Sequence, residues 1–349
     1  MSAEGKIGGM KAIQVMNYGG SDELALADVA IPEPGEGEAL VRMGMAGVNF
    51  IDVYMRTGIF KRSVTYENAP PFTPGMEGAG IIEKVGPGVD NVTAGDQVAY
   101  CLNLGSYAEF AAVPAWKLVK VPDGIPLDIA TALQLQGSTA HYLTHSLYPL
   151  KEGDSCLVHA GAGGLGQLVI QLAKARGAVV YTTVGSAEKA EIAKARGADH
   201  VILYREVDFA VAVSDLTGGE GVNVVYDSVG RDTIQGSLKC LKPRGVLSNN
   251  GNASGPIGAL DPLDLAEAGS VFFTRPHLAD YIPTAEERNR RADDLFRLYR
   301  EDKITVTIDR VFPLVDAKAA HDAIEGRQTK GKLLLEAEED QGSLPETGP

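Results

Sequence analysis

The stretch that decides the fold is Leu157-Val-His-Ala-Gly-Ala-Gly-Gly-Leu-Gly166, which runs into Gln167-Leu-Val-Ile-Gln-Leu-Ala-Lys174. An apolar, strand-like run enters the glycines, and helix-forming residues follow them. Gly161, Gly163 and Gly166 fit the pattern G-x-G-x-x-G, which is weak alone but strong between a strand and a helix. Glycine allows the tight turn and the close approach of a pyrophosphate, which then faces the N–H groups of the following helix. The stretch therefore predicts a dinucleotide-binding βαβ unit.

The residues after this loop narrow the choice of ligand. Gln167 follows Gly166 where P-loop NTPases have Lys, so that class is excluded locally. About 20 residues further on, NAD enzymes carry an Asp or Glu that holds the ribose 2′-OH, whereas this chain reads Val184-Gly-Ser186. Ser186 can cap the next helix, and Lys189 lies in its first turn. Because a helix N-terminus with a Lys suits a 2′-phosphate, we expect NADPH to be preferred over NADH.

The pattern of apolar residues differs between the first part of the chain and the rest. From Met10 to about Asp123, short alternating apolar runs are broken by Gly and Pro, which predicts a compact β-barrel or sandwich. From about Ile125, continuous apolar runs alternate with helix-length segments, the rhythm of a buried parallel sheet. The expected strands are 155–160, 179–184, 201–203, 222–226, 245–248, 270–274 and 332–335, and the expected helices include 165–176, 187–196 and 285–300.

Length and composition set outer limits. The 349 residues fit two domains, and 44% apolar with 22% charged residues is typical of soluble globular proteins. A formal net charge of −14 argues against a nucleic-acid partner or an anionic membrane surface. The three cysteines lie far apart, which excludes a disulfide framework and predicts a cytoplasmic protein. No apolar run approaches the ~18 residues of a membrane span, and residues 1–10 lack the apolar core of a signal peptide.

The two ends are expected to lie outside the fold. Residues 1–9 form an N-terminal extension, and residues 337–349 form an acidic tail that we predict to be disordered. The tail contains Leu344-Pro-Glu-Thr-Gly348, which matches the pattern that sortases cleave. No hydrophobic stretch with a basic end follows it before Pro349, so we interpret the match as chance or as a processing scar.

Several motifs carry a resemblance to a known family. They are Gly47-Val-Asn-Phe-Ile-Asp-Val-Tyr54, Pro74-Gly-Met-Glu-Gly-Ala-Gly80, Leu135-Gln-Gly-Ser-Thr-Ala-His-Tyr142, His159 to Gly166, Tyr226-Asp-Ser-Val-Gly230, Gly251-Asn-Ala-Ser-Gly255 and Thr274-Arg-Pro276. With them the chain resembles the zinc-free quinone oxidoreductase (zeta-crystallin-like) branch of the medium-chain dehydrogenase/reductases, the bacterial NADPH:quinone oxidoreductases most of all. The resemblance spans roughly residues 10–336.

The resemblance implies an α/β architecture of two domains. A GroES-like β-barrel domain takes residues 10–125 and 275–336, and a Rossmann domain with a doubly wound parallel sheet takes residues 126–274. The active cleft lies between them, and a homodimer is implied, with 270–274 as the candidate edge strand.

The same comparison bears on metal binding. Zinc-dependent relatives carry a catalytic Cys early in the first domain and a His in a Gly-His-Glu motif. This chain has Asn49 at the first position and Met76 at the second, so no metal is expected. His141 and His145 are spaced i, i+4 on a predicted helix and could imitate a metal pair. We interpret them as packing or surface histidines, since two ligands do not make a site.

The resemblance also assigns site residues. The candidate catalytic residues are Asn49, Asp52 and Tyr54, and the Tyr54 hydroxyl could bond a substrate carbonyl or deliver a proton. Lys189 and Tyr204, with Arg205 beside them, resemble the family's adenosine-phosphate contacts. Asn250 departs from the family pattern, which has an aromatic residue there. The expected cofactor contacts are Thr139, Ala160, Gly161, Gly163, Gly164, Leu165, Gly185, Ser186, Lys189, Tyr204, Ser228, Asn250, Gly251, Asn252, Phe273, Arg327 and Lys332.

Three functions remain open at this point. Hydride chemistry belongs to the nicotinamide, and a quinone needs no strong Lewis acid, so an NADPH:quinone oxidoreductase without zinc is the main prediction. The second is an NADPH-dependent reductase of activated C=C bonds, such as enones or enoyl thioesters. The third is a cofactor-binding structural or RNA-contacting protein. The only dense basic cluster, Arg288-Asn-Arg-Arg291, is interpreted as a solvated helix face, so no nucleic-acid partner is expected.

Overall fold

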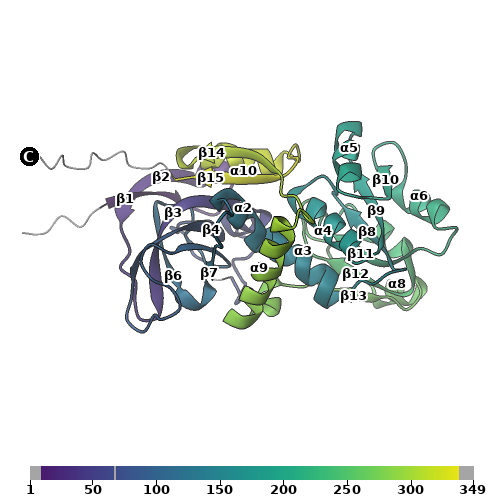
Figure 1. The fold of residues 1–349 in the computed structure, drawn as a ribbon. Coiled ribbons are helices and arrows are strands. Elements are labelled where there is room, and N and C mark those ends of the chain that lie inside the picture. The colour runs from purple at the N-terminus through teal and green to yellow at the C-terminus, as the bar shows by residue number, and fades with distance from the viewer. Residues whose placement is uncertain (1–8, 67, 338–349) are drawn as a thin grey trace, which may run out of the picture.

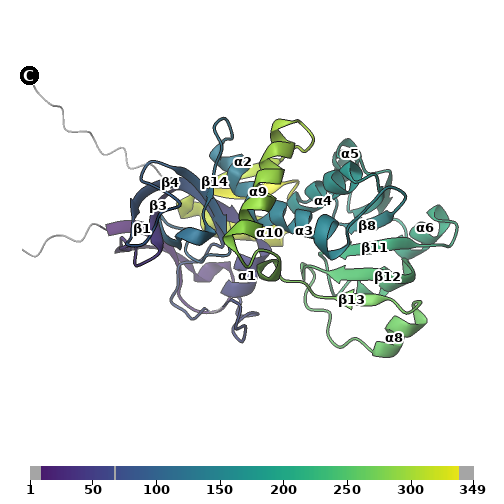
Figure 2. The same cartoon turned by 60° about the horizontal axis from the view of Figure 1, so that its bottom comes forward.

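The computed structural model describes residues 9–66 and 68–337, and the chain forms two lobes, each built on its own β-sheet (Figure 1). Helix α9 (Ala285–Arg300) lies between the lobes in both views of the ribbon (Figure 2). The expectations for residues 1–8 and for the tail from residue 338 onward, including Leu344-Pro-Glu-Thr-Gly348, lie outside the described residues.

The first lobe is the GroES-like domain. Its strands are β1 (Gly9–Val15), β2 (Leu24–Ala30), β3 (Glu38–Val48), β4 (Glu77–Val85), β5 (Gln97–Cys101), β6 (Phe110–Pro114), β7 (Val119–Lys120), β14 (Ile308–Pro313) and β15 (Lys332–Glu336). β1 pairs with β2, and the others follow the order β14-β15-β3-β4-β5-β7, with β6 on β3. A Cβ on Gly80 would lie 2.0 Å from the carbonyl oxygen of Arg42, so glycine permits the close pairing of β3 with β4.

The C-terminal segment returns to this lobe and completes its sheet. β15 runs antiparallel to β3, with Leu334 opposite Gly47, and β14 runs parallel to β15. Helix α10 (Ala317–Glu325) packs beside them and buries Ala320, His321 and Ile324. This return places Lys332 next to the end of β3, where the helix α1 (Phe50–Arg56) begins.

The second lobe is the Rossmann domain, as expected. Its strands are β8 (Ser155–His159), β9 (Val179–Val184), β10 (His200–Leu203), β11 (Val222–Asp227), β12 (Leu241–Asn249) and β13 (Phe272–Thr274). They are parallel and follow the order β10-β9-β8-β11-β12-β13. This is the doubly wound order, in which ligands bind where it reverses, at the carboxyl ends of the two central strands. Those central strands are β8 and β11.

The helices of the second lobe follow the strands in turn. They are α4 (Gly164–Ala175), α5 (Ala187–Ala195), α6 (Phe209–Leu216), α7 (Ile234–Lys239) and α8 (Pro262–Glu267), with short 3₁₀ turns elsewhere at Ser21–Glu23, Ala115–Lys117, Leu278–Tyr281 and Leu314–Asp316. The predicted helices at 165–176, 187–196 and 285–300 are thus confirmed to within a residue. The predicted strand at 245–248 is longer and begins at Leu241.

A long helix joins the two lobes. It comprises α2 (Leu127–Ala132) and α3 (Ser138–Tyr142), each followed by a π-helical stretch, at Leu133–Gly137 and Leu143–Leu147. One apolar cluster includes Ala99 of the first sheet, Leu143 of this helix and Val158 of the second sheet. The two lobes therefore share one continuous apolar core.

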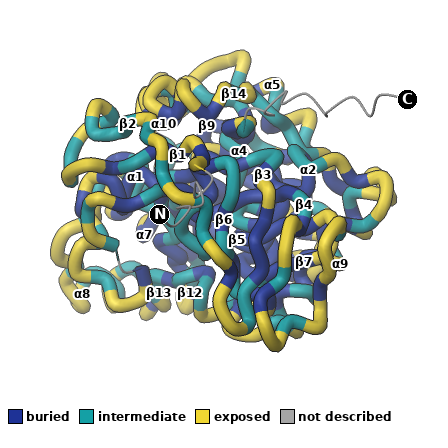
Figure 3. Tube along the Cα trace, turned by 90° about the vertical axis from the view of Figure 1, so that its left-hand side faces the viewer, coloured by how far each residue is buried: buried dark blue, intermediate teal, exposed yellow. Residues whose placement is uncertain are grey.

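Burial follows this architecture, with the sheets dark in the tube representation and the exposed residues concentrated in loops and at helix surfaces (Figure 3). Cys101, Cys156 and Cys240 are all buried and unpaired. Among the described residues, no helix is both long and apolar enough to cross a bilayer.

Candidate active site

The phosphate loop joins β8 to α4 in a turn that only small residues allow. Ala160 has a φ of 56°, in the left-handed region. A Cβ on Gly161 would lie 2.0 Å from Oγ1 of Thr182, and one on Gly166 would lie 2.3 Å from the carbonyl oxygen of Ala160. The helix therefore begins directly against the strand. The N–H groups of its first turn, including that of Leu165, have no acceptor within the helix and are available to an anion.

The end of β9 is basic, as the sequence predicts. Ser186 caps α5 by accepting the backbone N–H of Lys189 at 3.3 Å. A Cβ on Gly185 would lie 3.0 Å from Oη of Tyr204 and 3.5 Å from Nε of Arg205. Partial burial, followed by the nearby Arg205 guanidinium, lowers the pKa of Lys189. The structure thus brings these five expected residues together around one small space.

The opposite wall is organised by a buried carboxylate. Asp227 at the end of β11 accepts the N–H groups of Val229 and Gly230, both at 2.9 Å. This fixes the turn that contains Ser228, and a Cβ on Gly251 would lie 2.5 Å from the Ser228 carbonyl oxygen. The two loops therefore pack backbone to backbone.

Four other expected cofactor contacts have different surroundings. Oδ1 of Asn250 is buried without a partner among the described residues. The guanidinium of Arg327 donates to the carbonyl oxygen of Ala253 at 3.4 Å. Phe273 lies in β13, beside Leu247 of β12, and Thr139 is buried in α3, which packs on α4.

Tyr54 joins the two lobes directly across the cleft. Its Oη accepts the backbone N–H of Asn252 at 2.9 Å. Its ring packs edge-on against Phe60, with 5.5 Å between the centroids. Burial raises the pKa of Tyr54, although the neighbouring Arg275 guanidinium opposes the shift. The phenol therefore keeps its proton at neutral pH and can donate it in a hydrogen bond.

Asn49 belongs to a buried ionic cluster. Its Oδ1 accepts from Nζ of Lys332 at 2.7 Å, and its Nδ2 donates to Oε2 of Glu77 at 2.9 Å. Lys332 and Glu77 form an ion pair at 2.5 Å, and their side chains are 1% and 0% exposed. Oε1 of Glu77 also accepts the N–H of Leu135 in the long helix. The sequence led us to expect Lys332 at the cofactor, but the structure commits its ammonium to this cluster.

Asp52 lies at the end of a chain of buried hydrogen bonds. Its Oδ2 accepts the N–H of Asn49 at 2.8 Å and the hydroxyl of Tyr107 at 3.3 Å. Nε2 of His321 lies 3.2 Å from that hydroxyl, and Arg56 contacts Nδ1 of His321 at 2.9 Å. Because Arg can only donate, Nδ1 accepts and Nε2 carries the proton, which it donates to Tyr107.

This environment makes Asp52 difficult to ionise. Burial raises its pKa to about 7, against the opposing hydrogen bond from Asn49. The carboxyl has no exposed surface, so any effect that it has on a bound substrate passes through its neighbours. We therefore treat Asp52 as a positioning residue.

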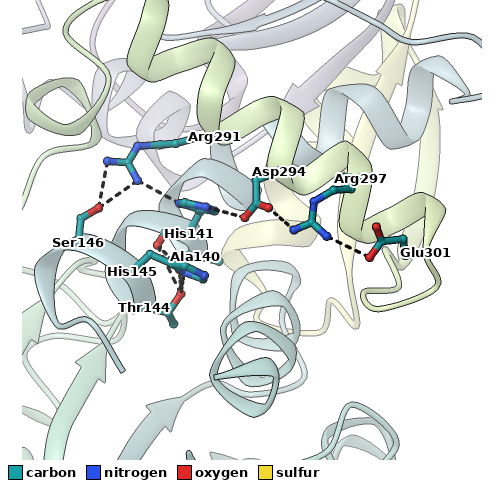
Figure 4. Close-up of polar contacts among 9 residues, drawn as sticks. All are labelled: Ala140, His141, Thr144, His145, Ser146, Arg291, Asp294, Arg297 and Glu301. Atoms are coloured by element: carbon teal, nitrogen blue, oxygen red, sulfur yellow. Dashed lines mark hydrogen bonds and ion pairs between the residues drawn. The ribbon is translucent and has the colours of Figure 1, made fainter. Parts of the chain in front are cut away.

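The histidine pair lies in a third polar cluster, between α3 and α9 (Figure 4). His141, His145 and Asp294 place potential ligand atoms within 4.8 Å of one another. Nη1 of Arg291 donates to Nδ1 of His141 at 3.0 Å, so Nε2 carries the proton that it donates to Asp294. Burial lowers the pKa of His141 to about 4. Neither nitrogen of His141 is therefore left with a free lone pair for a metal ion.

This cluster corrects one expectation. The segment Arg288-Asn-Arg-Arg291 is not a solvated helix face, because Arg288 and Arg291 are 3% and 1% exposed while Arg290 points to solvent. Charge density along a sequence does not reveal which side of a helix is covered. Here the long helix and the loops of the first lobe cover the side that carries Arg288 and Arg291.

Several residues of the cleft escaped the sequence analysis. Tyr107, His321 and Arg56 come from three distant segments, and nothing local in the sequence links them to Asp52. Arg275 stood in a recognised motif, but only the fold shows that it lies near Tyr54. Glu77 could have been chosen, because it follows Met76 in the family motif.

Comparisons with known proteins agree with this architecture. A family model for the GroES-like domain of alcohol dehydrogenases matches residues 35–123, and one for zinc-binding dehydrogenases matches residues 164–284. A quinone oxidoreductase of Pseudomonas aeruginosa is 42% identical over 328 residues, covering 93% of this chain and 99% of the relative. A 2-haloacrylate reductase of a Burkholderia species is 42% identical over 330 residues, covering 93% and 98%.

A solved structure adds the three-dimensional match. The Escherichia coli quinone oxidoreductase complexed with NADPH superposes with a TM-score of 0.89 at 39% identity, covering 93% of this chain and 99% of that one. A GroES-like domain combined with a Rossmann domain defines the class of two-domain, dinucleotide-dependent oxidoreductases. The chain belongs to the medium-chain dehydrogenase/reductase family, in its quinone oxidoreductase branch.

The raised pKa of Asp52 predicts a specific pH dependence. Between 3.8 and about 7 the folded state holds a proton that the unfolded chain has lost, so this group's contribution to stability falls as pH rises through that window. Asp52→Asn removes the titration. We expect its free energy of unfolding, relative to the wild type, to improve by about 2–3 kcal/mol between pH 5 and pH 8. Urea unfolding at the two pH values measures this.

Asp28→Asn, at a well-exposed position, is the matched control for a general charge effect. A difference between Asp52→Asn and the wild type that does not change with pH contradicts the assignment of a neutral, buried carboxyl.

The buried ion pair gives a second prediction. Lys332→Met leaves the Glu77 carboxylate buried without its cation, and we expect a loss of about 3–5 kcal/mol in the free energy of unfolding. The double variant Lys332→Met, Glu77→Gln removes the stranded charge as well, so it should recover part of that loss. Denaturant unfolding of the three proteins tests this, and a loss below about 1 kcal/mol in the single variant refutes it.

Proposed function

We propose that this chain is an NADPH-dependent oxidoreductase that transfers a hydride to a quinone without using zinc. One observation carries the proposal: a dinucleotide cradle with a basic ribose end faces a cleft in which Asn49 and Met76 stand at the positions of zinc ligands. The quinone oxidoreductases at about 40% identity support it, including the one crystallised with NADPH.

The residues present fit the cofactor. The glycines of the loop let β8 and α4 pack closely together, so the N–H groups of the first turn of α4 are available to a phosphate. Asn250 adds a buried side-chain oxygen that has no partner among the described residues. NADPH supplies the hydride when bound. We propose that it is held by Thr139, Ala160, Gly161, Gly163, Gly164, Leu165, Gly185, Ser186, Lys189, Tyr204, Arg205, Ser228, Asn250, Gly251, Asn252, Phe273 and Arg327.

Tyr54 is the residue that we assign to the substrate. Its oxygen already accepts the N–H of Asn252, so its own proton can be donated to a quinone oxygen. Arg275 lies close enough to influence the phenol and adds positive charge on the same side. Both groups favour the negative charge that develops on that oxygen as the hydride arrives.

Three further residues influence the substrate only indirectly, through the helix that carries Tyr54. They are Asn49, Asp52 and Lys332. Lys332 and Glu77 hold the Asn49 amide in place, and Asn49 with Asp52 forms the cap of α1. Because α1 carries Tyr54, this capped start fixes the position of the phenol. We propose that the three residues position the helix rather than exchange protons with the substrate.

The reduction of activated C=C bonds is the second candidate. The 2-haloacrylate reductase, at 42% identity, supports it. An enone or acrylate also develops negative charge on oxygen during hydride addition, so Tyr54 and Arg275 would serve that reaction equally well.

Assembly and location complete the proposal. We propose a homodimer through the free edge of β13, because that strand ends its sheet and Phe272 is 64% exposed. A cytoplasmic location is supported by three buried free thiols, which persist in a reducing compartment. We keep the domain boundaries at residues 125 and 275 as part of the proposal.

Cofactor choice can be tested at Lys189. We expect wild-type protein to bind NADPH more tightly than NADH, and Lys189→Ala to weaken NADPH binding by about ten- to a hundredfold while leaving NADH unchanged. Fluorescence titration measures both constants. Lys194→Ala, on the same helix but at an exposed position paired with Glu191, should change neither constant. Equal wild-type affinities for the two cofactors rule the idea out.

The reaction itself is tested by following NADPH oxidation with a panel of quinones and a matched panel of enones. We expect higher kcat/KM values with quinones, and a fall of about tenfold or more in kcat for Tyr54→Phe, the size of one lost transition-state hydrogen bond. Higher values with enones favour the second candidate. Tight NADPH binding without turnover of either panel refutes both enzymatic functions.

A further inference from the structure

A cavity of about 260 Å³ is lined by residues of the first lobe and by residues 279–288, which lead into α9. Its apolar wall includes Met55, which follows Tyr54 on α1, and Met76, which precedes Glu77 on β4. The aromatic ring of Tyr66 also lines it and stacks on Phe60, at 5.4 Å between centroids. Phe60 in turn contacts Tyr54, so two aromatic rings and the adjacent Met55 connect the wall of the cavity to the residue that we assign to the substrate.

The other end of this cavity is formed by two cations. Nζ of Lys117 donates to the carbonyl oxygen of Leu102 at 2.8 Å and to Oδ1 of Asn103 at 3.2 Å. Nη1 of Arg288 donates to the carbonyl oxygen of Cys101 at 2.9 Å. Arg288 is only 3% exposed, and its Nε is buried without any hydrogen-bond partner among the described residues.

Neither cation has a counter-charge in the part of the chain that the structure describes, where no carboxylate lies within 4.0 Å of either group. The thiol of Cys101 cannot supply one, because burial raises its pKa to about 11. Burial and the neighbouring Arg288 lower the pKa of Lys117.

The indole of Trp116 compensates these charges only in part. It lies 5.4 Å from the guanidinium of Arg288 and 5.7 Å from the ammonium of Lys117. A ring face attracts a cation but accepts no directed hydrogen bond at Nε. Buried charges in proteins are normally paired or fully hydrogen-bonded. Arg56 pairs with Glu325, and all three nitrogens of the buried Arg291 guanidinium donate hydrogen bonds, whereas Nε of Arg288 has no acceptor among the described residues.

We propose that Arg288 and Lys117 form a carboxylate subsite for the substrate, which would be an organic acid with an apolar body and a reducible C=C bond or quinone ring. A carboxylate can receive N–H groups from a guanidinium and an ammonium together. The apolar wall formed by Met55, Met76 and Tyr66 suits the body of such a molecule. This inference rests on the proposed NADPH-dependent reduction and names the substrate class for that same cleft.

The test uses trans-benzoylacrylate and its methyl ester, which share the same enone and differ at the carboxyl group, ionised in the acid and uncharged and methylated in the ester. Reduction of either adds a hydride from NADPH and a proton from water across the C=C bond, giving the saturated product and NADP⁺. We expect the wild type to show the lower KM for the acid. Arg288→Gln and Lys117→Gln should each raise the KM for the acid by about ten- to a hundredfold, with the ester changed less than about twofold.

Arg290→Gln is the matched control, since it removes one positive charge from the same helix at an exposed position. It should leave both KM values unchanged. Equal changes for acid and ester in Arg288→Gln and Lys117→Gln, or a wild type that does not distinguish the two substrates, overturn the proposal. Lys117→Gln keeps the test decisive if Arg288→Gln does not fold, because Lys117 is only half-buried.

Benzoate binding separates failure of the subsite from failure of the proposed function. If neither these two substrates nor the quinone panel turns over, the proposed function fails. In that case benzoate should still raise the Tm of the wild type and not that of Arg288→Gln. Equal stabilisation of both proteins by benzoate overturns the subsite. Glu67 lies outside the described residues, so Glu67→Gln is measured in parallel. If it abolishes the preference for acid over ester, or raises benzoate affinity about tenfold or more, Glu67 is the counter-charge and the subsite is refuted.

Discussion

The cleft depends on one buried ion pair, between Lys332 and Glu77. Lys332 begins the last strand of the chain and Glu77 begins β4, so the pair joins the C-terminal return to the first lobe. Two fully buried charges are tolerated only when each is paired and hydrogen-bonded. Asn49 and the N–H of Leu135 supply those further bonds. The same contacts that neutralise the pair therefore tie together β3, β4, β15 and the long helix, around the start of α1.

This arrangement satisfies a buried carboxylate from within the chain. A buried carboxylate at Glu77 needs a neighbouring cation, and the Lys332 ammonium provides one from within the chain. The ion pair cannot contact a substrate directly, because both side chains are buried. The residue that we assign to the substrate is on the helix that the cluster anchors, with Tyr54 two residues after Asp52 and five after Asn49. The residues that neutralise buried charge, Lys332 and Glu77, therefore differ from Tyr54, which we propose contacts the substrate.

The sequence predicted the fold better than it predicted the site. The glycine loop, the parallel strands and α9 all follow from local patterns of period and spacing, which sequence displays directly. Local reasoning also placed Lys189 and Ser186 at the cap of α5. It failed to reveal the partners of Lys332, which lie more than 250 residues away in the chain. It failed too for Arg288 and Arg291, because burial of a charged helix face is decided by what packs on it.

The acidic composition need not oppose an anionic cofactor or substrate. At physiological ionic strength, charges more than about 8 Å apart across solvent are largely screened, so the net charge of −14 acts weakly at any one site. The attraction of an anion to this protein therefore depends on nearby cations. Two pairs of cations include partly or wholly buried side chains, Lys189 with Arg205 and Lys117 with Arg288. Partial burial lowers the pKa values of both lysines, which means that each is held at a cost to the apo protein. An anion bound at either of these two proposed sites offsets that cost, because it supplies the counter-charge that the lysine lacks among the described residues.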